Sequence, residues 1–242
     1  AGDCVASLVA YYKFTNAQWD AEMTDLSGYG NHGAVTGQLK AVSDSFALFF
    51  PFDGLDDAVL VPHAQSLSLA ADVTVSFWVK PESGKGGWIV EKDRYGEYAV
   101  RIATNEAVEF WQGVGSGNYA VWMAFPPGSL KPNQWQHIAL SRDVDSGLLR
   151  GYRQGQIENN GSLSIEPAGS TNSLIIGAGH DGSRFQGGLA ELKIYRKALS
   201  ASEVYLDYDA DLDGLPNPWE EKNGLNPYSS SDALTDLDYD SF

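Results

Sequence analysis

The chain contains a single cysteine, Cys4, among its 242 residues. One thiol cannot form an intrachain disulfide, nor can it supply a metal site built from several cysteines. No apolar run approaches the ~20 residues that a membrane-spanning helix needs, so membrane insertion is not expected. Basic residues are also scarce, with 16 Lys and Arg against 32 Asp and Glu and a formal net charge of −16. Because phosphate contacts require clustered Lys and Arg, the composition argues against binding to nucleic acid or anionic lipid.

The negative charge is concentrated at one end of the chain. Residues 203–242 contain 11 Asp and Glu and one basic residue, Lys222, so this segment carries a charge of −10. The remaining 202 residues carry only −6. An acidic block of this kind is either a solvated tail or a cation site, and the spacing of its carboxylates distinguishes the two.

The acidic segment has the spacing of a calcium-binding loop. Residues 209–220 read D-x-D-x-D-G-x5-E, the pattern of an EF-hand-type loop. A hard divalent cation takes six to eight oxygen ligands, and the glycine of the pattern allows the sharp turn that wraps the chain around it. The expected ligands, with Leu215 acting through its carbonyl, are Asp209, Asp211, Asp213, Leu215, Asn217 and Glu220. The alternative is a solvated acidic run.

The same segment resembles the thrombospondin type 3 and related bacterial calcium repeats. The resemblance covers about 34 residues and rests on D-x-D-x-D-G-L-P, the following W-E, and G-L-N-P at residues 224–227. A second acidic series begins at Asp232 but lacks the glycine and the closing glutamate, so a complete second site is not expected. Such repeats usually link domains, which implies that further domains of a longer polypeptide accompany this one.

The body of the chain reads as an antiparallel β-sandwich. Val73, Val75, Phe77 and Val79 alternate with more polar residues, which is typical of a strand with one buried face. Many short strand-like stretches are separated by glycine-rich breaks, without the strand–helix alternation of a parallel sheet. This pattern predicts an all-β jelly roll. One short helix is expected near 201–207, because residues 200–203 form a capping box.

Six motifs in order resemble the laminin G-like, or concanavalin A-like, jelly-roll domains. They are Leu8–Phe14, the D-x-S-G-x-G-N-H-G loop 25–33, F-D-G-x-D-D at 52–57, the strand 75–81 ending K-P, W-x-H-x-A at 135–139, and the closing strand 189–200. The resemblance spans about residues 7–207. We therefore expect a sandwich domain at 1–207 and a truncated thrombospondin type 3-like segment with a calcium loop and helix at 208–242.

The laminin G-like resemblance also implies a structural calcium ion in the sandwich. The ligands that it implies are Asp25, Asn31 and Glu191, with a backbone oxygen such as that of Gly28. Either Asp53, Asp56 or Asp57 could serve instead. All are hard oxygen donors, which suit calcium better than zinc. The alternative is that these residues only form hydrogen-bonded turns.

No convincing catalytic site is found in the sequence. Glu91, Asp93 and Glu97 loosely resemble the acid triplet of sandwich glycosidases, but the last gap is too long and Tyr95-Gly96 is typical of a turn. His137 lies in the W-x-H-x-A motif, where a packed structural histidine is expected. Neither a nucleophile elbow nor a nucleotide-binding fingerprint occurs. We therefore expect a protein that is not an enzyme.

Aromatic residues gather beside the glycine-rich loops of the middle third. Sugar C–H groups stack on aromatic faces, and amides bind sugar hydroxyls. Loops on a rigid sandwich commonly carry function. The candidate ligand-binding residues are Trp88, Tyr95, Trp111, Gln112, Asn118, Tyr119 and Trp122. The alternative is that these aromatics fill the core or cover a sheet face.

The sequence favours a non-catalytic carbohydrate-binding or adhesive module of a secreted bacterial multidomain protein, stabilised by calcium. Its expected partner is a polysaccharide or glycan. A location outside the cell fits, because millimolar calcium there would fill weak sites. The second interpretation is a protein–protein adhesion or spacer domain without a glycan site. The third and weakest is a polysaccharide hydrolase using Glu91 and Asp93.

Overall fold

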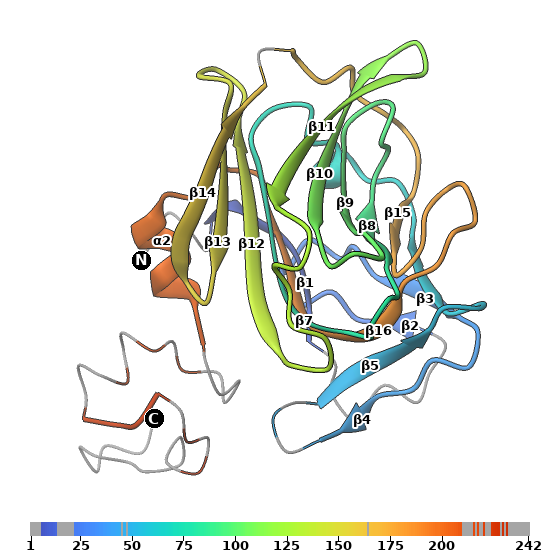
Figure 1. Cartoon of the computed structure of the whole chain (residues 1–242). Coiled ribbons are helices and arrows are strands. Elements are labelled where there is room, and N and C mark those ends of the chain that lie inside the picture. The colour runs from blue at the N-terminus through green and yellow to red at the C-terminus, as the bar shows by residue number, and fades with distance from the viewer. Residues whose placement is uncertain are drawn as a thin grey trace.

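The computed structural model of the chain is a two-layer β-sandwich (Figure 1). The structure describes residues 6–13, 22–44, 46, 48–163 and 165–209. Beyond these ranges it describes residues 215, 217, 220, 224–227, 229 and 231. Within this part of the chain, two sheets of eight strands face each other, which confirms the all-β antiparallel sandwich expected from the sequence.

The first sheet, sheet A, contains the closing strand of the domain at its centre. In spatial order it consists of β14 (Gln156–Ser162), β13 (Leu148–Arg153), β12 (Gln136–Asp143), β7 (Val73–Pro81), β16 (Gln186–Tyr195), β5 (Leu48–Asp53) and β4 (Val42–Ser43), with β1 (Leu8–Tyr12) also paired to β16. All of these pairs are antiparallel. Strands far apart in sequence therefore become neighbours, as in a jelly roll.

The second sheet, sheet B, carries the aromatic middle third of the chain at one edge. In spatial order it consists of β11 (Asn118–Phe125), β10 (Val108–Gly115), β9 (Tyr98–Ile102), β8 (Gly87–Glu91), β15 (Leu174–Ile176), β6 (Ala58–Val61), β3 (Gly33–Thr36) and β2 (Glu22–Met23). A short 3-10 helix, η1 (Gln65–Leu67), follows β6. Since β11 pairs only with β10 in the described sheet, its other side is an edge.

Side-chain alternation decides which residues enter the core between the sheets. In β7, Val75, Phe77 and Val79 are fully buried and belong to the main apolar cluster. In β10, Val108 and Phe110 face the same core. Because successive side chains of a strand point to opposite faces, the residues between them lie on the outer faces. The sequence pattern therefore locates both the core and the two outer surfaces.

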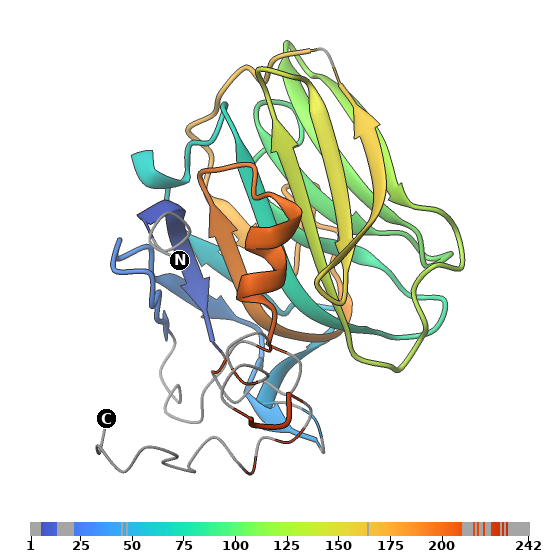
Figure 2. The same cartoon turned by 90° about the vertical axis from the view of Figure 1, so that its left-hand side faces the viewer.

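The short helix α2 (Ala201–Asp207) covers part of the outer face of sheet A (Figure 2). It begins with the expected capping box, in which the Ser200 hydroxyl accepts from the Glu203 backbone and the Glu203 side chain bonds back. Val204 packs into a small cluster with Tyr152 and Tyr195 on that face. The helix thus lies where the sequence predicts it, and it directs the chain across sheet A.

Immediately after α2, Tyr208 packs on two rings of sheet A. Its ring centroid lies 5.9 Å from that of Trp78 in a stacked arrangement and 5.2 Å from that of His137. His137 is buried, and its Nε2 lies 2.9 Å from the Ser76 hydroxyl. Burial lowers the pKa of His137 from 6.5 to about 3, since the charged imidazolium would lose its hydration. The expected packed, structural histidine is therefore what the fold contains.

None of the helices in the described part of the chain has the length and apolar character that a membrane crossing requires.

We expect acid to destabilise the protein partly through His137. The folded state keeps this ring neutral down to about pH 3. The unfolded chain takes up the proton near pH 6.5, so unfolding gains up to about 1.4 kcal/mol per pH unit below that value. In His137→Gln this contribution is absent. We measure the free energy of unfolding of both proteins in urea between about pH 6 and pH 4. Over this range the value for the wild type should fall, relative to that of the variant, by about 1 kcal/mol per pH unit. A constant difference between the two would contradict this account.

Candidate functional site

The candidate aromatic residues of β10 and β11 divide between the two faces of sheet B. The register pairs Phe110 with Trp122, and Trp111 with Val121. Phe110 is fully buried in the core, so Trp122 shares the inner face, whereas Trp111 lies on the outer face. Tyr119 is 47% exposed and lies on the outer face with Trp111. The alternation of side chains along the strands therefore places on opposite faces residues that lie close together in the sequence.

Three of the candidates form a continuous outer surface, which we call the aromatic platform: Tyr95, Trp111 and Tyr119. The ring centroids of Trp111 and Tyr119 lie 4.5 Å apart with an angle of 34° between the planes. Those of Tyr95 and Tyr119 lie 5.8 Å apart. Tyr95 is 39% exposed, so aromatic faces remain open to solvent beside one another. Asn118, also exposed, lies next to Tyr119 at the start of β11.

A glycine in β10 brings Tyr95 onto the platform. Gly113 lies so close to the turn that follows β8 that a Cβ atom there would meet Gly96 N at 2.0 Å and Tyr95 C at 2.1 Å. The backbone of Gly115 donates a 2.8 Å hydrogen bond to the carbonyl of Tyr95. The glycine-rich end of β10 thus holds the turn by direct backbone packing, and no larger residue fits at position 113.

Trp88 lies beneath the platform instead of on it. It is only 3% exposed, and its ring meets the Trp111 ring edge-on with centroids 5.3 Å apart. The guanidinium groups of Arg94 and Arg101 lie 5.4 Å and 5.7 Å from its ring centroid. At Gly179, a Cβ atom would lie 2.3 Å from the ring, so the loop before β16 closes over it. Trp88 supports the exposed rings without being reachable itself.

Charged side chains border the platform, and the sequence alone did not single out Arg94, Arg101 or Glu109. Arg94 lies 4.8 Å from the Tyr95 ring centroid and forms a 3.1 Å ion pair with Asp181. The indole nitrogen of Trp111 donates a 2.9 Å hydrogen bond to Glu109, whose carboxylate lies 3.6 Å from Arg101. Strand alternation could have identified these two residues: Glu109 is two positions from Trp111 on β10, and Arg101 on β9 pairs with Glu109, so all three side chains lie on the same face.

Two candidates lie away from this surface. Gln112 is 1% exposed, and its amide donates to the carbonyl of Ile165. Trp122 packs against the other sheet, where a Cβ atom at Gly161 would lie 2.2 Å from its indole nitrogen. Both belong to the inner side of sheet B, which is the alternative that the sequence left open for the large aromatics.

The acidic residues of the weak hydrolase hypothesis serve as turn and ion-pair partners. Asp93 accepts hydrogen bonds from Tyr95 N at 2.8 Å and from the Ser170 hydroxyl at 2.8 Å. Glu91 is 1% exposed and binds Arg94 at 3.2 Å. Burial raises the pKa of Glu91, although Arg94 opposes the shift. With these contacts, Glu91 and Asp93 do not form a pair of carboxylates that a substrate could reach.

The loop around Asp25 is a hydrogen-bonded turn. One carboxylate oxygen of Asp25 accepts 2.9 Å bonds from the backbone of Tyr11 and of Ser27. The other accepts from the Ser27 hydroxyl at 2.8 Å and from the backbone of Asn31 at 2.9 Å. Gly28 lies in this turn with a φ of 88°. These contacts match the turn that the sequence offered as the alternative, and calcium at this loop stays a prediction.

The other residues expected at that metal site have partners of their own. The Asn31 amide donates to the carbonyl of Val9 at 2.7 Å. Glu191 accepts a 3.0 Å hydrogen bond from the Tyr11 hydroxyl and lies 3.3 Å from the Lys13 ammonium. Asp25 and Glu191 therefore contact opposite ends of the same residue, Tyr11.

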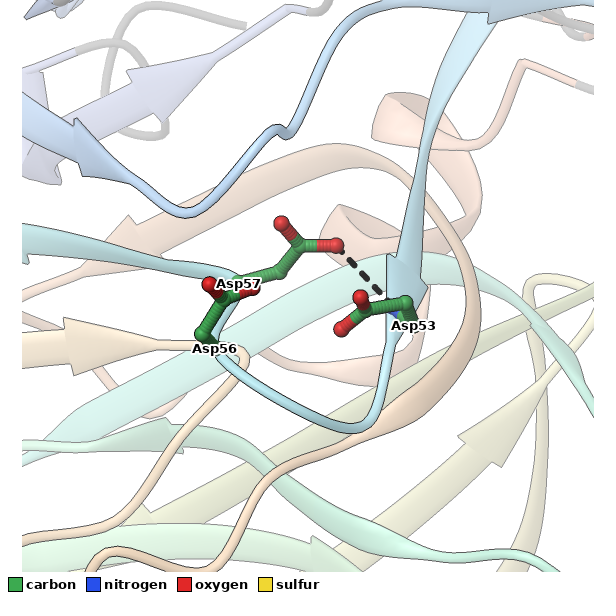
Figure 3. Close-up of side chains that lie close together, drawn as sticks. All are labelled: Asp53, Asp56 and Asp57. Carbon is green, nitrogen blue, oxygen red and sulfur yellow. Dashed lines mark hydrogen bonds between the residues drawn. The ribbon is translucent and has the colours of Figure 1, made fainter.

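The alternative ligands lie together in the bend between β5 and β6 (Figure 3). Asp53, Asp56 and Asp57 each offer an oxygen within 4.8 Å of the others. Asp57 is buried, and it accepts hydrogen bonds from Asp53 N at 3.0 Å and Gln38 N at 3.1 Å. Desolvation raises its pKa. These three carboxylates make up the compact acidic cluster found in the described part of the sandwich.

The C-terminal segment that the sequence predicts to bind calcium is described only in part. Asp209, Asn217 and Glu220 are all buried, and Glu220 is 0% exposed. The Asn217 backbone donates a 2.9 Å hydrogen bond to the carbonyl of Tyr208, and Leu215 is half-buried. Asp211 and Asp213 lie outside the described residues.

This two-layer antiparallel jelly roll, with its aromatic surface on an outer sheet face, defines a lectin-type β-sandwich. The chain belongs to the family described as the concanavalin A-like lectin/glucanases superfamily, whose model matches residues 52–205, more than half of the chain. This confirms the laminin G-like resemblance seen in the sequence.

Curated relatives carry similar segments within much longer chains. Adhesion G-protein coupled receptor V1 of Danio rerio is 25% identical over 161 residues, which are 62% of this chain and 2% of the receptor. The neuronal pentraxin receptor of Homo sapiens is 31% identical over 108 residues, which are 40% of this chain and 22% of the receptor. The chain therefore matches only a small part of each relative.

Solved structures with the same fold include toxin binding domains. The binding domain of Paraclostridial Mosquitocidal Protein 1 aligns with a TM-score of 0.70 at 16% identity, over 85% of this chain and 52% of that one. A botulinum neurotoxin type C structure, whose title reports cell entry dependent on interaction with two ganglioside molecules, aligns with a TM-score of 0.68 at 13% identity, over 86% and 52%. At these identities the similarity shows the fold.

We expect Trp122→Ala to lower the unfolding free energy by about 3 kcal/mol, because it empties space between the sheets. Val121→Ala, one residue away on the outer face and 40% exposed in the wild type, should change it by no more than about 0.5 kcal/mol. Chemical denaturation of both variants checks this. Equal effects would show that the assignment of the two faces is wrong.

Proposed function

We propose that this domain is a non-catalytic carbohydrate-binding or adhesive module of a secreted bacterial multidomain protein. The aromatic platform is the observation that carries the proposal. Tyr95, Trp111 and Tyr119 lie side by side on a rigid sheet face, and two of them expose 39% and 47% of their surface. Adjacent aromatic faces suit successive sugar rings, and the bordering Arg94 and Glu109 offer a donor and an acceptor for hydroxyls.

The arrangement of charge favours a neutral glycan. Around the platform, Arg94 is paired with Glu91 and Asp181, and Arg101 with Glu109. The net charge of −16 opposes sulfated or uronic polymers unless calcium bridges them. Relatives named as an adhesion receptor and a pentraxin receptor support a binding role, and they favour a place at the cell surface or outside the cell.

A calcium site in the 208–242 segment, read as a thrombospondin type 3-like unit, is the second part of the proposal. Burying a carboxylate is costly unless a cation or hydrogen bonds compensate, and Asp209 and Glu220 are 7% and 0% exposed. Both stand at ligand positions of the D-x-D-x-D-G-x5-E pattern, as does the buried Asn217. A calcium ion bound to these oxygen atoms would explain why the side chains are buried. Within the sandwich, the candidate ligands are Asp25, Gly28, Asn31 and Glu191 or, alternatively, the acidic cluster of Asp53, Asp56 and Asp57.

Protein–protein adhesion is the second candidate function. Next to the platform on the outer face of β11, Val121 and Met123 are 40% and 48% exposed. Exposed aliphatic side chains at a sheet edge suit a protein partner better than a sugar. The glycan test below separates the two functions.

We expect Tyr119→Ala and Tyr95→Ala each to weaken glycan binding by about tenfold, which corresponds to ~1.4 kcal/mol. The matched control is Tyr29→Ala. Tyr29 is 43% exposed and lies 5.5 Å from the Arg196 guanidinium, so it resembles Tyr95 in exposure and cation contact but lies outside the platform. A glycan array selects the ligand, and calorimetry with the selected oligosaccharide measures the affinities.

Three outcomes of this experiment would count against the glycan function at the platform. The wild type could bind no saccharide on the array, both platform variants could keep wild-type affinity, or the control could lose as much as they do. The first of these, combined with a captured protein partner whose affinity falls in Met123→Ala, would favour the adhesion alternative.

We expect calcium to stabilise the folded chain and to protect its C-terminal segment from proteases. At a calcium concentration 100 times the dissociation constant, a site that binds only the folded form adds about 2.7 kcal/mol. For a domain of this size that raises the melting temperature by about 5–10 °C. Scanning calorimetry with calcium and with EDTA measures the shift, and titration calorimetry gives the stoichiometry.

Substitutions assign the calcium effect to a site. Glu220→Gln should abolish the calcium-dependent stabilisation that comes from the C-terminal loop. Asp53→Asn with Asp56→Asn should abolish any stabilisation that comes from the acidic cluster, and Asp25→Asn any that comes from the Asp25 loop. Asp145→Asn, in the exposed β12–β13 turn, is the matched control. An unchanged melting temperature and unchanged protease resistance after chelation would refute the calcium proposal.

A further inference from the structure

A groove opens on the outer face of sheet A, on the opposite side of the sandwich from the aromatic platform. It is an open surface groove with a volume of about 380 Å³. We call it the glycine groove. Its lining residues are Phe49, Pro51, Phe52, Lys80, Glu82, Ser83, Asn133, Gly187 and Gly188. Three neighbouring strands contribute to it: β5, β16 and β7.

Two consecutive glycines make the floor of the groove. Gly188 pairs with Pro51 on one side and with Lys80 on the other, so the floor lies at the centre of sheet A. A Cβ atom at Gly188 would lie 3.0 Å from both the Phe49 and Trp135 rings. At Gly187 the φ angle is 146°, and a Cβ atom would lie 2.7 Å from the Lys80 carbonyl. A side chain at Gly188 would press on these two rings, and one at Gly187 would meet the β7 backbone and the buried Phe185 ring.

Phe49 lines one side of the groove and packs against Trp135, and this pair is held in place before any ligand arrives. The Asp44 carboxylate accepts a 2.8 Å bond from the Lys80 ammonium and a 3.0 Å bond from the Trp135 indole. The Lys80 nitrogen lies 5.8 Å from the Phe49 ring centroid and 5.9 Å from that of Trp135. Phe49 and Trp135 meet edge-on with centroids 5.1 Å apart. Such prior ordering reduces the conformational cost of binding.

Part of the groove rim is polar and open to solvent. Glu82, Ser83 and Asn133 are all exposed. Glu82 accepts a 2.9 Å hydrogen bond from the Gln186 amide, and Asn133 N donates to the Pro81 carbonyl at 2.8 Å. The rim therefore offers a carboxylate, a hydroxyl and an amide, which together can accept from and donate to vicinal hydroxyls.

We propose that the glycine groove is a second saccharide site, which takes a neutral hexopyranose unit. An aromatic wall facing a bare backbone floor suits the apolar face of a sugar ring, and the polar rim suits its hydroxyls. Since Asp44 neutralises Lys80 and Glu82 adds a negative charge, the groove disfavours uronic or sulfated rings.

The groove shares its ligand class with the proposed function but none of its residues. The two sites lie on opposite outer faces, so one domain would engage two glycan chains at once. Bivalent engagement raises the overall avidity and allows a single copy to cross-link a polysaccharide.

The experiment uses the full chain labelled with 5-fluorotryptophan and read by fluorine NMR. Trp135 beside the groove and Trp111 on the platform report on the two sites separately, and single Trp→Phe variants assign the signals of the seven tryptophans. The probes are neutral tetrasaccharides of glucose, mannose and galactose, tested one at a time. We expect the Trp135 signal to move with at least one of them.

Two variants locate that response. Phe49→Leu keeps an apolar wall but removes the aromatic face, and Glu82→Gln removes the carboxylate. Each should weaken the Trp135 response by about tenfold, the effect of ~1.4 kcal/mol. The exposed Glu166→Gln is the matched control for Glu82, and Tyr119→Ala should leave the Trp135 response unchanged.

The outcomes separate this proposal from the proposed function. A shift of Trp111 without a shift of Trp135 overturns the groove and leaves the platform standing. A shift of Trp135 alone supports the groove and counts against the platform. A Trp135 shift that survives both Phe49→Leu and Glu82→Gln overturns the groove as its source.

Discussion

The structure depends on one constraint: each of the two antiparallel sheets must bury one of its faces against the other sheet. Since side chains alternate along a strand, a residue's odd or even position decides whether it enters the core or lies on an outer face. In β7 this rule buries Val75, Phe77 and Val79. In β10 and β11 it sends Phe110 and Trp122 inward but leaves Trp111 and Tyr119 outside. The aromatic platform exists because the core can use only every second residue of these strands. The proposed binding surface thus lies on the solvent-facing side of a sheet whose other side is packed into the core.

Glycine positions control how the outer faces are shaped. Gly113 lets the turn that contains Tyr95 pack directly on β10 and so completes the platform. Gly187 and Gly188 leave the backbone of β16 bare between two aromatic-bearing neighbours and so create the groove. Helix α2 and Tyr208 cover a further part of sheet A over Trp78 and His137. Tyr208 thus packs on the sandwich directly before Asp209, the first residue of the D-x-D-x-D-G-x5-E pattern.

Much of the fold could be predicted from the sequence, because alternation, turn residues and the capping box are local signals. The strand at 73–81, the helix at 201–207 and the structural role of His137 are examples. The site could be predicted only in part. Tyr95, Trp111 and Tyr119 come together, but Trp122 and Gln112 face inward, and their parity becomes clear only once the register of β10 and β11 is known. The glycine groove joins residues more than a hundred positions apart, so no local pattern reveals it. At Asp25, turn hydrogen bonds and metal ligation require the same residue types, and the sequence cannot separate them.

The central claim is that the outer face of sheet B binds saccharide through its exposed rings. Intermolecular NOEs between a carbon-13-labelled oligosaccharide, chosen for its affinity, and the protein's aromatic protons test this most directly. The account predicts contacts from sugar C–H groups to the rings of Trp111 and Tyr119, and none to Phe110 or Trp122 on the opposite face of the same two strands. A bound saccharide with no contact to Trp111, Tyr119 or Tyr95 would contradict it.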